Sequence, residues 1–115
     1  MNAVESVRRI ITEKMAGELM RRGIERGVYE RHDALLAPGP CGKITGDALG
    51  SMLVGKHGRE YGLCLAKKLS LPGHLHVLAR ALEIPHTLAE KIYDASRIEK
   101  QPARDIAQKL EEGKF

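Results

Sequence analysis

Apolar residues recur at helical spacing through the first quarter of the chain. At three- and four-residue steps they form a single stripe, which predicts one long amphipathic helix over residues 3–29. The stripe consists of Val4, Val7, Ile11, Met15 and Leu19. Lys14 and Glu18 fall where a strict heptad seam would continue, so we expect the stripe to pack on the protein's own core rather than on a second helix.

A loop rich in proline and glycine follows at residues 33–44. Pro38 and Pro40 cannot continue a helix, so we expect this loop to join the N-terminal helix to the helices after it. Thr45 then suits the N-cap of a short helix, with Asp47 in its first turn, where the helix dipole favours an acidic group. This part of the chain is therefore predicted to contain no strand.

Residues 60–78 fit two structures. Leucines at alternate positions suit a strand, and Pro72-Gly73 suits a hairpin turn. Ala66, Lys67 and Lys68 instead favour a helix over residues 59–69. We predict the helix and keep the hairpin as the alternative.

The C-terminal third carries clearer helix boundaries. One helix stops at Ile84-Pro85, and Thr87 followed three residues later by Glu90 has the spacing of a capping box. Pro102 suits the first position of a last helix, which Gly113 closes. The whole pattern predicts an all-α protein, a compact bundle of about five helices in a single domain over residues 1–115.

Residues 75–95 resemble the helix-turn-helix pattern of bacterial DNA-binding proteins. Ala79 is small enough for two helices to approach closely, while Glu83 stands at the turn position that usually holds glycine. The outward face of the second helix would carry His86, Thr87, Glu90, Lys91 and Asp94. Its two acidic residues suit base edges and phosphates poorly, so an ordinary pair of helices joined by a proline turn is the competing interpretation.

Positive charge is concentrated in the middle of the chain. The formal net charge is +4, and the basic residues of segment 43–80 account for all of that surplus. We expect these residues to contact a polyanion, either duplex nucleic acid or an acidic protein surface, with further contacts from the helix-turn-helix-like pair. The predicted contacts are Lys56, Arg59, Lys67, Lys68, Arg80, His86, Thr87 and Lys91. Three tyrosines, one phenylalanine and no tryptophan are too few for a base-stacking sheet, which leaves a duplex backbone as the nucleic-acid partner.

Sequence spacing identifies no catalytic, metal-binding or cofactor-binding residues. His74 and His76 would point to different faces of a helix, Cys64 lies between leucines like a small core residue, and no pair of acids has the spacing of an acid–base couple. Two cysteines cannot build a disulfide framework, and no apolar run is long enough to span a bilayer. We therefore expect a cytoplasmic, non-enzymatic protein without cofactor, metal or membrane contact.

Two functions fit these features. The first is a binding module, a regulatory DNA-binding protein that uses its basic central segment. The second is a small accessory subunit, inhibitor or adaptor that acts by protein–protein interaction, either as a homodimer or within a larger complex. The first requires the cations between Lys43 and Arg80 to gather on one outer surface of the fold.

Overall fold

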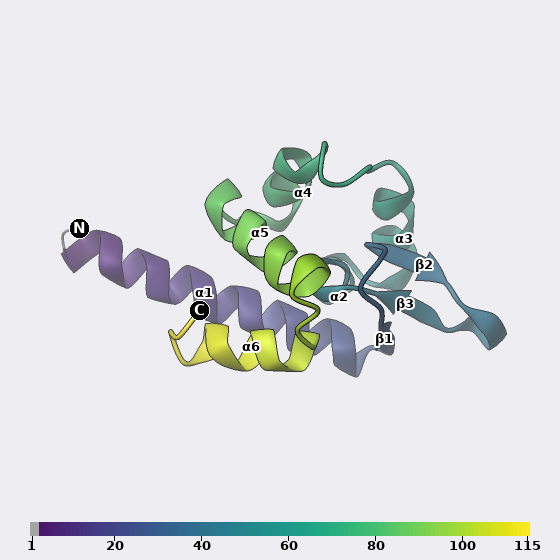
Figure 1. Ribbon diagram of the computed structural model, residues 1–115, viewed down its shortest axis with the longest axis horizontal. Coiled ribbons are helices and arrows are strands. Elements are labelled where there is room, and N and C mark those ends of the chain that lie inside the picture. The colour runs from purple at the N-terminus through teal and green to yellow at the C-terminus, as the bar shows by residue number, and fades with distance from the viewer. Residues whose placement is uncertain (1–2) are drawn as a thin grey trace.

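The computed structural model of the protein describes residues 3–115 and is mostly helical (Figure 1). The helices are α1 (Ala3–Glu25), α2 (Ala48–His57), α3 (Arg59–Lys67), α4 (Leu75–Leu82), α5 (His86–Tyr93) and α6 (Ala103–Glu111). A π-helical segment, Asp94–Ile98, directly continues α5. The short strands are β1 (Val28–Glu30), β2 (Leu36–Pro38) and β3 (Ile44–Gly46), with a 3₁₀ turn at Pro40–Gly42.

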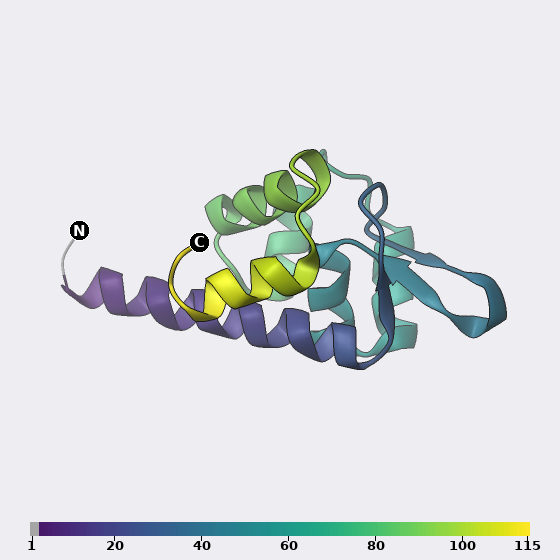
Figure 2. The ribbon, with the colours of Figure 1, turned by 60° about the horizontal axis from the view of Figure 1, so that its bottom comes forward.

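Helix α2 forms the centre of the fold. Its residues 48–55 are all buried, because α1 packs along one side while α3, α4, α5 and α6 contact the others. Its composition of leucine, methionine, valine, alanine and glycine suits a helix surrounded by protein. Helix α6 runs beside the C-terminal half of α1 in both views (Figures 1 and 2).

Glycines allow α1 and α2 to approach each other at backbone distance. A Cβ atom added at Gly23 of α1 would lie 1.8 Å from the carbonyl oxygen of Ser51 in α2. A Cβ atom added at Gly55 of α2 would lie 2.0 Å from the carbonyl oxygen of Leu19 in α1. The two helices therefore touch through their main chains, and no larger residue fits at either position.

A three-stranded sheet spans residues 28–46, which include the predicted loop 33–44, so the all-α prediction is wrong in this part. The strand order is β1-β3-β2, with β3 parallel to β1 and antiparallel to β2. Each strand has three residues, which is too short for alternation of apolar and polar positions to show. Helix α1 also ends earlier than predicted, because Gly27 takes a positive φ of 97° and starts the turn into β1.

The predicted helix over residues 59–69 is confirmed, and the hairpin alternative is wrong. Two predicted caps are also wrong. Asp47 caps α2 by accepting a hydrogen bond from the Gly50 N–H, so the predicted cap Thr45 is two residues too early and lies in β3. Pro85 precedes α5 with no side-chain cap, so the Thr87–Glu90 capping box is not formed.

The molecule is elongated, with principal extents of 48 × 25 × 25 Å. The N-terminal half of α1 projects from one end, and the β2–β3 hairpin projects from the other (Figures 1 and 2). None of the helices within residues 3–115 has an apolar stretch long enough to cross a bilayer.

Candidate functional site

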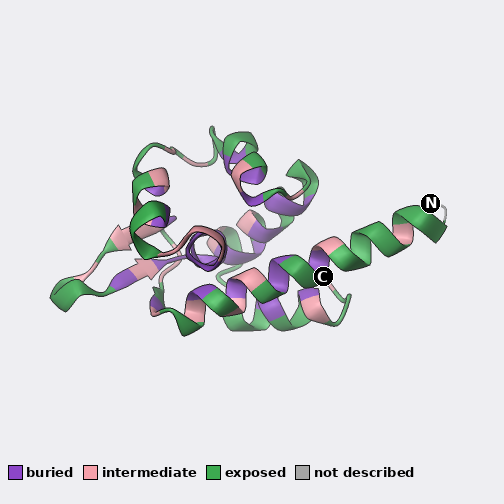
Figure 3. Cartoon of the chain, turned by 180° about the vertical axis from the view of Figure 1, so that it is seen from behind, coloured by how far each residue is buried: buried purple, intermediate pink, exposed green. Residues whose placement is uncertain are grey.

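The N-terminal half of α1 exposes a row of large apolar side chains. Val4, Val7, Ile11 and Met15 are each more than half exposed to solvent, and we name this set the α1 stripe. At about 100° per residue they lie within about 80° of one another around the helix and extend along about 17 Å of it. Figure 3 shows this half of α1 as a largely exposed surface that projects beyond α6.

The predicted packing of this stripe on the core is wrong. The buried face of α1 lies about 180° around the helix from the stripe. It consists of Glu13, Ala16, Gly17, Met20 and Gly23. Three of the five are alanine or glycine, which lets α2 and α6 approach α1 closely, while most of the large apolar residues of α1 lie on the side that faces solvent. Of the predicted set, Leu19 alone packs against the core.

Charges beside the α1 stripe are mainly positive. Arg8 and Lys14 flank it on either side, Arg22 follows at its C-terminal end, and Glu18 lies close to its centre line. All four side chains are exposed, and within residues 3–115 the three basic ones form no ion pair. The stripe is therefore an apolar strip with a basic border.

Helices α4 and α5 form the predicted helix-turn-helix-like pair. Glu83 ends α4 in the left-handed region, with φ 58° and ψ 41°, and Pro85 starts α5 two residues later. A left-handed residue at this position is what lets two short helices join through a tight turn, and glutamate tolerates it at some cost in strain. The anchoring residues are buried as predicted, namely Leu78, Ala79, Leu82, Leu88 and Ile92.

The five predicted side chains lie on α5 and on the first residue of the π-helical segment, and all five are exposed: His86, Thr87, Glu90, Lys91 and Asp94. Glu90 pairs with His86 across 2.8 Å from Oε1 to Nδ1. Thr87 and Lys91 line a groove of about 440 Å³ whose other wall is α1, including Arg8. A recognition helix reads bases with its N-terminal residues, and here that end of α5 faces α1.

The predicted basic residues of α2 and α4 differ in how far their charge is compensated. Lys56, at the end of α2, forms an ion pair of 3.4 Å with Glu83 in the α4–α5 turn. Arg80 is exposed on α4, on the side away from the buried Leu78 and Leu82. The charge of Lys56 is thus partly compensated, while that of Arg80 is open to solvent.

The basic residues of α3 are divided between its two ends. Arg59 begins the helix and donates from Nη2 to the Gly42 carbonyl oxygen at 2.7 Å. Lys67 and Lys68 are exposed at the opposite end, about 12 Å along the helix axis from Arg59. The cleft that Arg59 lines also contains Lys43 and none of the other cations between Lys43 and Arg80.

A buried polar network, which the sequence does not reveal, joins α2 to the π-helical segment. Asp47 accepts hydrogen bonds from the Gly50 N–H at 2.8 Å and from Arg97 Nε at 3.1 Å. The neighbouring Ala48 N–H donates to Ser96 Oγ at 3.1 Å. Arg97 also lies over the Tyr93 ring, 5.2 Å from its centroid. Fifty residues separate Asp47 from Arg97, so no local spacing could have identified this pair.

Burial raises the pKa of Asp47 to about 6, although the Gly50 N–H and Arg97 both oppose this shift. A carboxyl group with a raised pKa is often part of a functional site. Here the Asp47 side chain has no exposed surface, and its hydrogen bonds are made within the protein. A substrate could not reach it, so the network acts by holding the start of α2 against the π-helical segment.

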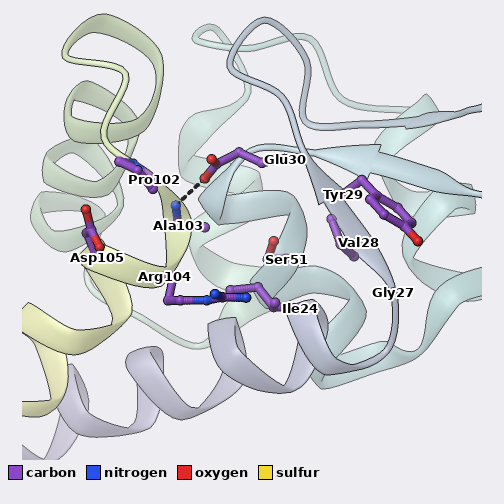
Figure 4. A pocket seen from close by; sticks show the side chains of 10 residues that line it. All are labelled: Ile24, Gly27, Val28, Tyr29, Glu30, Ser51, Pro102, Ala103, Arg104 and Asp105. Atoms are coloured by element: carbon purple, nitrogen blue, oxygen red, sulfur yellow. Dashed lines mark hydrogen bonds between the residues drawn. The ribbon is translucent and has the colours of Figure 1, made fainter.

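A shallow cleft of about 600 Å³ lies between the end of α1, β1 and the start of α6 (Figure 4). Its most notable contact is made by Glu30, whose Oε1 accepts a hydrogen bond from the Ala103 N–H. The Glu30 carboxylate therefore caps α6, which Pro102 leaves without a side-chain cap of its own. Asp105, the other acid in this lining, projects away from Glu30, so the cleft presents no acid–base pair.

Cysteine and metal-ligand positions add no further site. Cys64 is exposed on α3, so its predicted place in the core is wrong, while Cys41 is exposed in the 3₁₀ turn. Within residues 3–115, no group of three or more histidine, cysteine, aspartate or glutamate side chains is arranged to hold a metal ion.

Comparison of the chain with models of protein families, with curated proteins and with solved structures finds no match in any of the three.

Proposed function

We propose that the protein is a non-catalytic binding module that docks a protein partner through the α1 stripe. The observation that carries this proposal is a row of four large apolar side chains, each more than half exposed, on the side of α1 opposite the core. Contiguous exposed apolar surface of this kind marks interaction sites more often than ordinary protein surface. Of the two functions expected from the sequence, the adaptor or accessory role fits this surface better.

The partner chemistry follows from the shape and border of the α1 stripe. A convex helix with one apolar row pairs best with the apolar face of another helix, laid along it. Arg8, Lys14 and Arg22 at the border favour acidic residues on the flanks of that helix, while Glu18 near the centre line opposes them. The occupant we propose is an amphipathic helix with acidic flanks. Each stripe residue that it covers adds about 1 kcal/mol.

The test uses two synthetic helical peptides with the same leucine face, one flanked by glutamate and one by lysine. We expect the glutamate-flanked peptide to bind more tightly, measured by fluorescence anisotropy. Val7→Asp together with Ile11→Asp should weaken this binding by at least about tenfold, because the apolar row is interrupted by charge. The melting temperature should change little, because both side chains are exposed.

The control is Val77→Asp, which adds one such negative charge at an exposed apolar residue of α4 and should leave binding unchanged. Equal binding of the two peptides would contradict the role of the basic border. Sedimentation of the free chain as a stable dimer that Ile11→Asp dissociates would show that a second copy, not a foreign helix, occupies the stripe.

A second candidate, DNA binding, is favoured by one observation, the left-handed Glu83 between α4 and α5. In this alternative, Thr87 and Lys91 contact the duplex. We expect the apparent affinity for a random duplex to fall steeply with salt, by about one log unit per log of salt for each phosphate neutralised. Electrophoretic mobility shifts at two salt concentrations measure the salt dependence. The same assay compares Lys91→Gln on α5 with the control Lys109→Gln on α6. Equal shifts for both variants would exclude α5 as the contact.

A further inference from the structure

A cleft of about 790 Å³ lies at the end of the molecule opposite the α1 stripe, between the β2–β3 hairpin and the first turn of α3. We name it the cationic cleft. Its lining comes from two segments, residues 38–44 and residues 57–63. The members used below are Gly42, Lys43, His57, Arg59, Glu60 and Tyr61.

Two cations in this cleft are held in place without a carboxylate partner. Lys43, which lines the cationic cleft, has its Nζ over the ring of Tyr29, 4.9 Å from the ring centroid; Tyr29 itself lines the cleft of Figure 4. Arg59 uses Nη2 to donate to the Gly42 carbonyl oxygen, which leaves its other N–H donors available. Neither forms an ion pair among the residues that the structure describes. Each contact orients a cation while leaving its charge uncompensated, as an anion-binding site requires.

The remaining lining provides one acidic residue and one ring surface. Glu60 is exposed and forms no ion pair in the described part of the chain, so it reduces the positive potential of the cationic cleft without cancelling it. Tyr61 is about half exposed and meets the His57 ring edge-on, with ring centroids 5.3 Å apart. An exposed ring supported by a second ring offers a face on which a planar group can stack.

We propose that the cationic cleft binds a nucleoside monophosphate, with Lys43 and Arg59 on the phosphate and Tyr61 beneath the base. We choose a phosphate ligand because the cleft is lined by two cations, Lys43 and Arg59. The Arg59 guanidinium can form two parallel hydrogen bonds to phosphate oxygens. The first turn of α3 adds backbone N–H groups with no side-chain cap, at the positive end of its dipole. This site is independent of the α1 stripe, and neither proposal requires the other.

The test is titration of the ¹⁵N-labelled full chain with AMP, followed by two-dimensional NMR. We expect shifts confined to residues 38–44 and 57–63, and weaker binding of both inorganic phosphate and adenosine. Arg59→Gln and Lys43→Gln should each weaken AMP binding by about tenfold, because each removes a charge-assisted contact. Tyr61→Leu should weaken AMP binding while leaving inorganic phosphate unchanged.

Two further variants distinguish a built site from general attraction of anions. Glu60→Gln should tighten AMP binding by a fewfold, because it removes the one negative charge in the lining. Lys68→Gln removes an equal positive charge at the far end of α3 and should leave the affinity unchanged. Absence of shifts in the two segments, an equal loss in Lys68→Gln, or equal affinity for AMP and phosphate would each overturn the proposal.

Discussion

Gly23→Ala is expected to lower the free energy of unfolding by about 3 kcal/mol or more. In an exposed helix the same change stabilises by up to about 1 kcal/mol, because alanine is the better helix former. Here the added Cβ would lie 1.8 Å from the Ser51 carbonyl oxygen, which belongs to the backbone of α2 and cannot move alone. The helices must separate, and the core between them loses contacts.

Gly62→Ala is the matched control for this prediction. Gly62 is also a buried glycine inside a helix, but an added Cβ would meet Val54 Cγ2 at 3.4 Å, an ordinary contact distance. The same substitution should therefore be neutral or stabilising there. Urea unfolding followed by circular dichroism gives both values. If Gly23→Ala cost no more than Gly62→Ala, the close crossing of α1 and α2 would be wrong.

Asp47→Ala is expected to cost about 3 kcal/mol, because it removes the α2 cap and leaves Arg97 without its carboxylate. Asp47→Asn should cost less, because an amide oxygen can still accept from the Gly50 N–H. Urea unfolding at pH 7 measures both variants. A loss below about 1 kcal/mol in Asp47→Ala would show that the network between α2 and the π-helical segment contributes little to stability.

The pH dependence of the same carboxyl gives a second measurement. Since burial raises its pKa from 3.8 to about 6, the folded protein holds this proton more tightly than the unfolded chain does. The free energy of unfolding should therefore rise as the pH falls from 7 to 5, by about 1 kcal/mol from this group. The stabilisation by Asp47 is complete below pH 3.8, the pKa of the carboxyl in the unfolded chain, and is lost as the pH rises through about 6, its pKa in the folded protein. The free energy of unfolding is measured against pH for the wild type and for Asp47→Asn, and the difference between the two curves separates the Asp47 contribution from that of the histidines. Parallel curves would contradict this prediction.

The helices that the sequence predicts best are those with local boundary signals. The α4–α5 pair follows from leucines at three- and four-residue steps, a small residue at Ala79 and a proline turn, all within twenty residues of sequence. The face on which α1 packs could not be predicted in this way. Its contacts depend on Gly17 and Gly23, whose role appears only when the backbones of α2 and α6 are beside them.

The candidate sites also divide into those that local sequence predicts and those that depend on contacts between distant segments. The exposure of α5 residues such as Thr87 and Lys91 is predictable, because helix periodicity alone determines it. The cationic cleft depends on the β2–β3 hairpin meeting α3, and strands of three residues carry no periodic signal. The Asp47–Arg97 pair depends on the π-helical segment, where the extra residue per turn changes the direction in which side chains point.

The length of the molecule has a consequence for how it could act. The α1 stripe and the cationic cleft lie at opposite ends of a body 48 Å long, with the rigid centre of α2 between them (Figures 1 and 2). Two occupants would therefore not collide, and each could associate and dissociate without displacing the other. With both proposed occupants attached at once, a chain of this shape would raise the local concentration of one near the other.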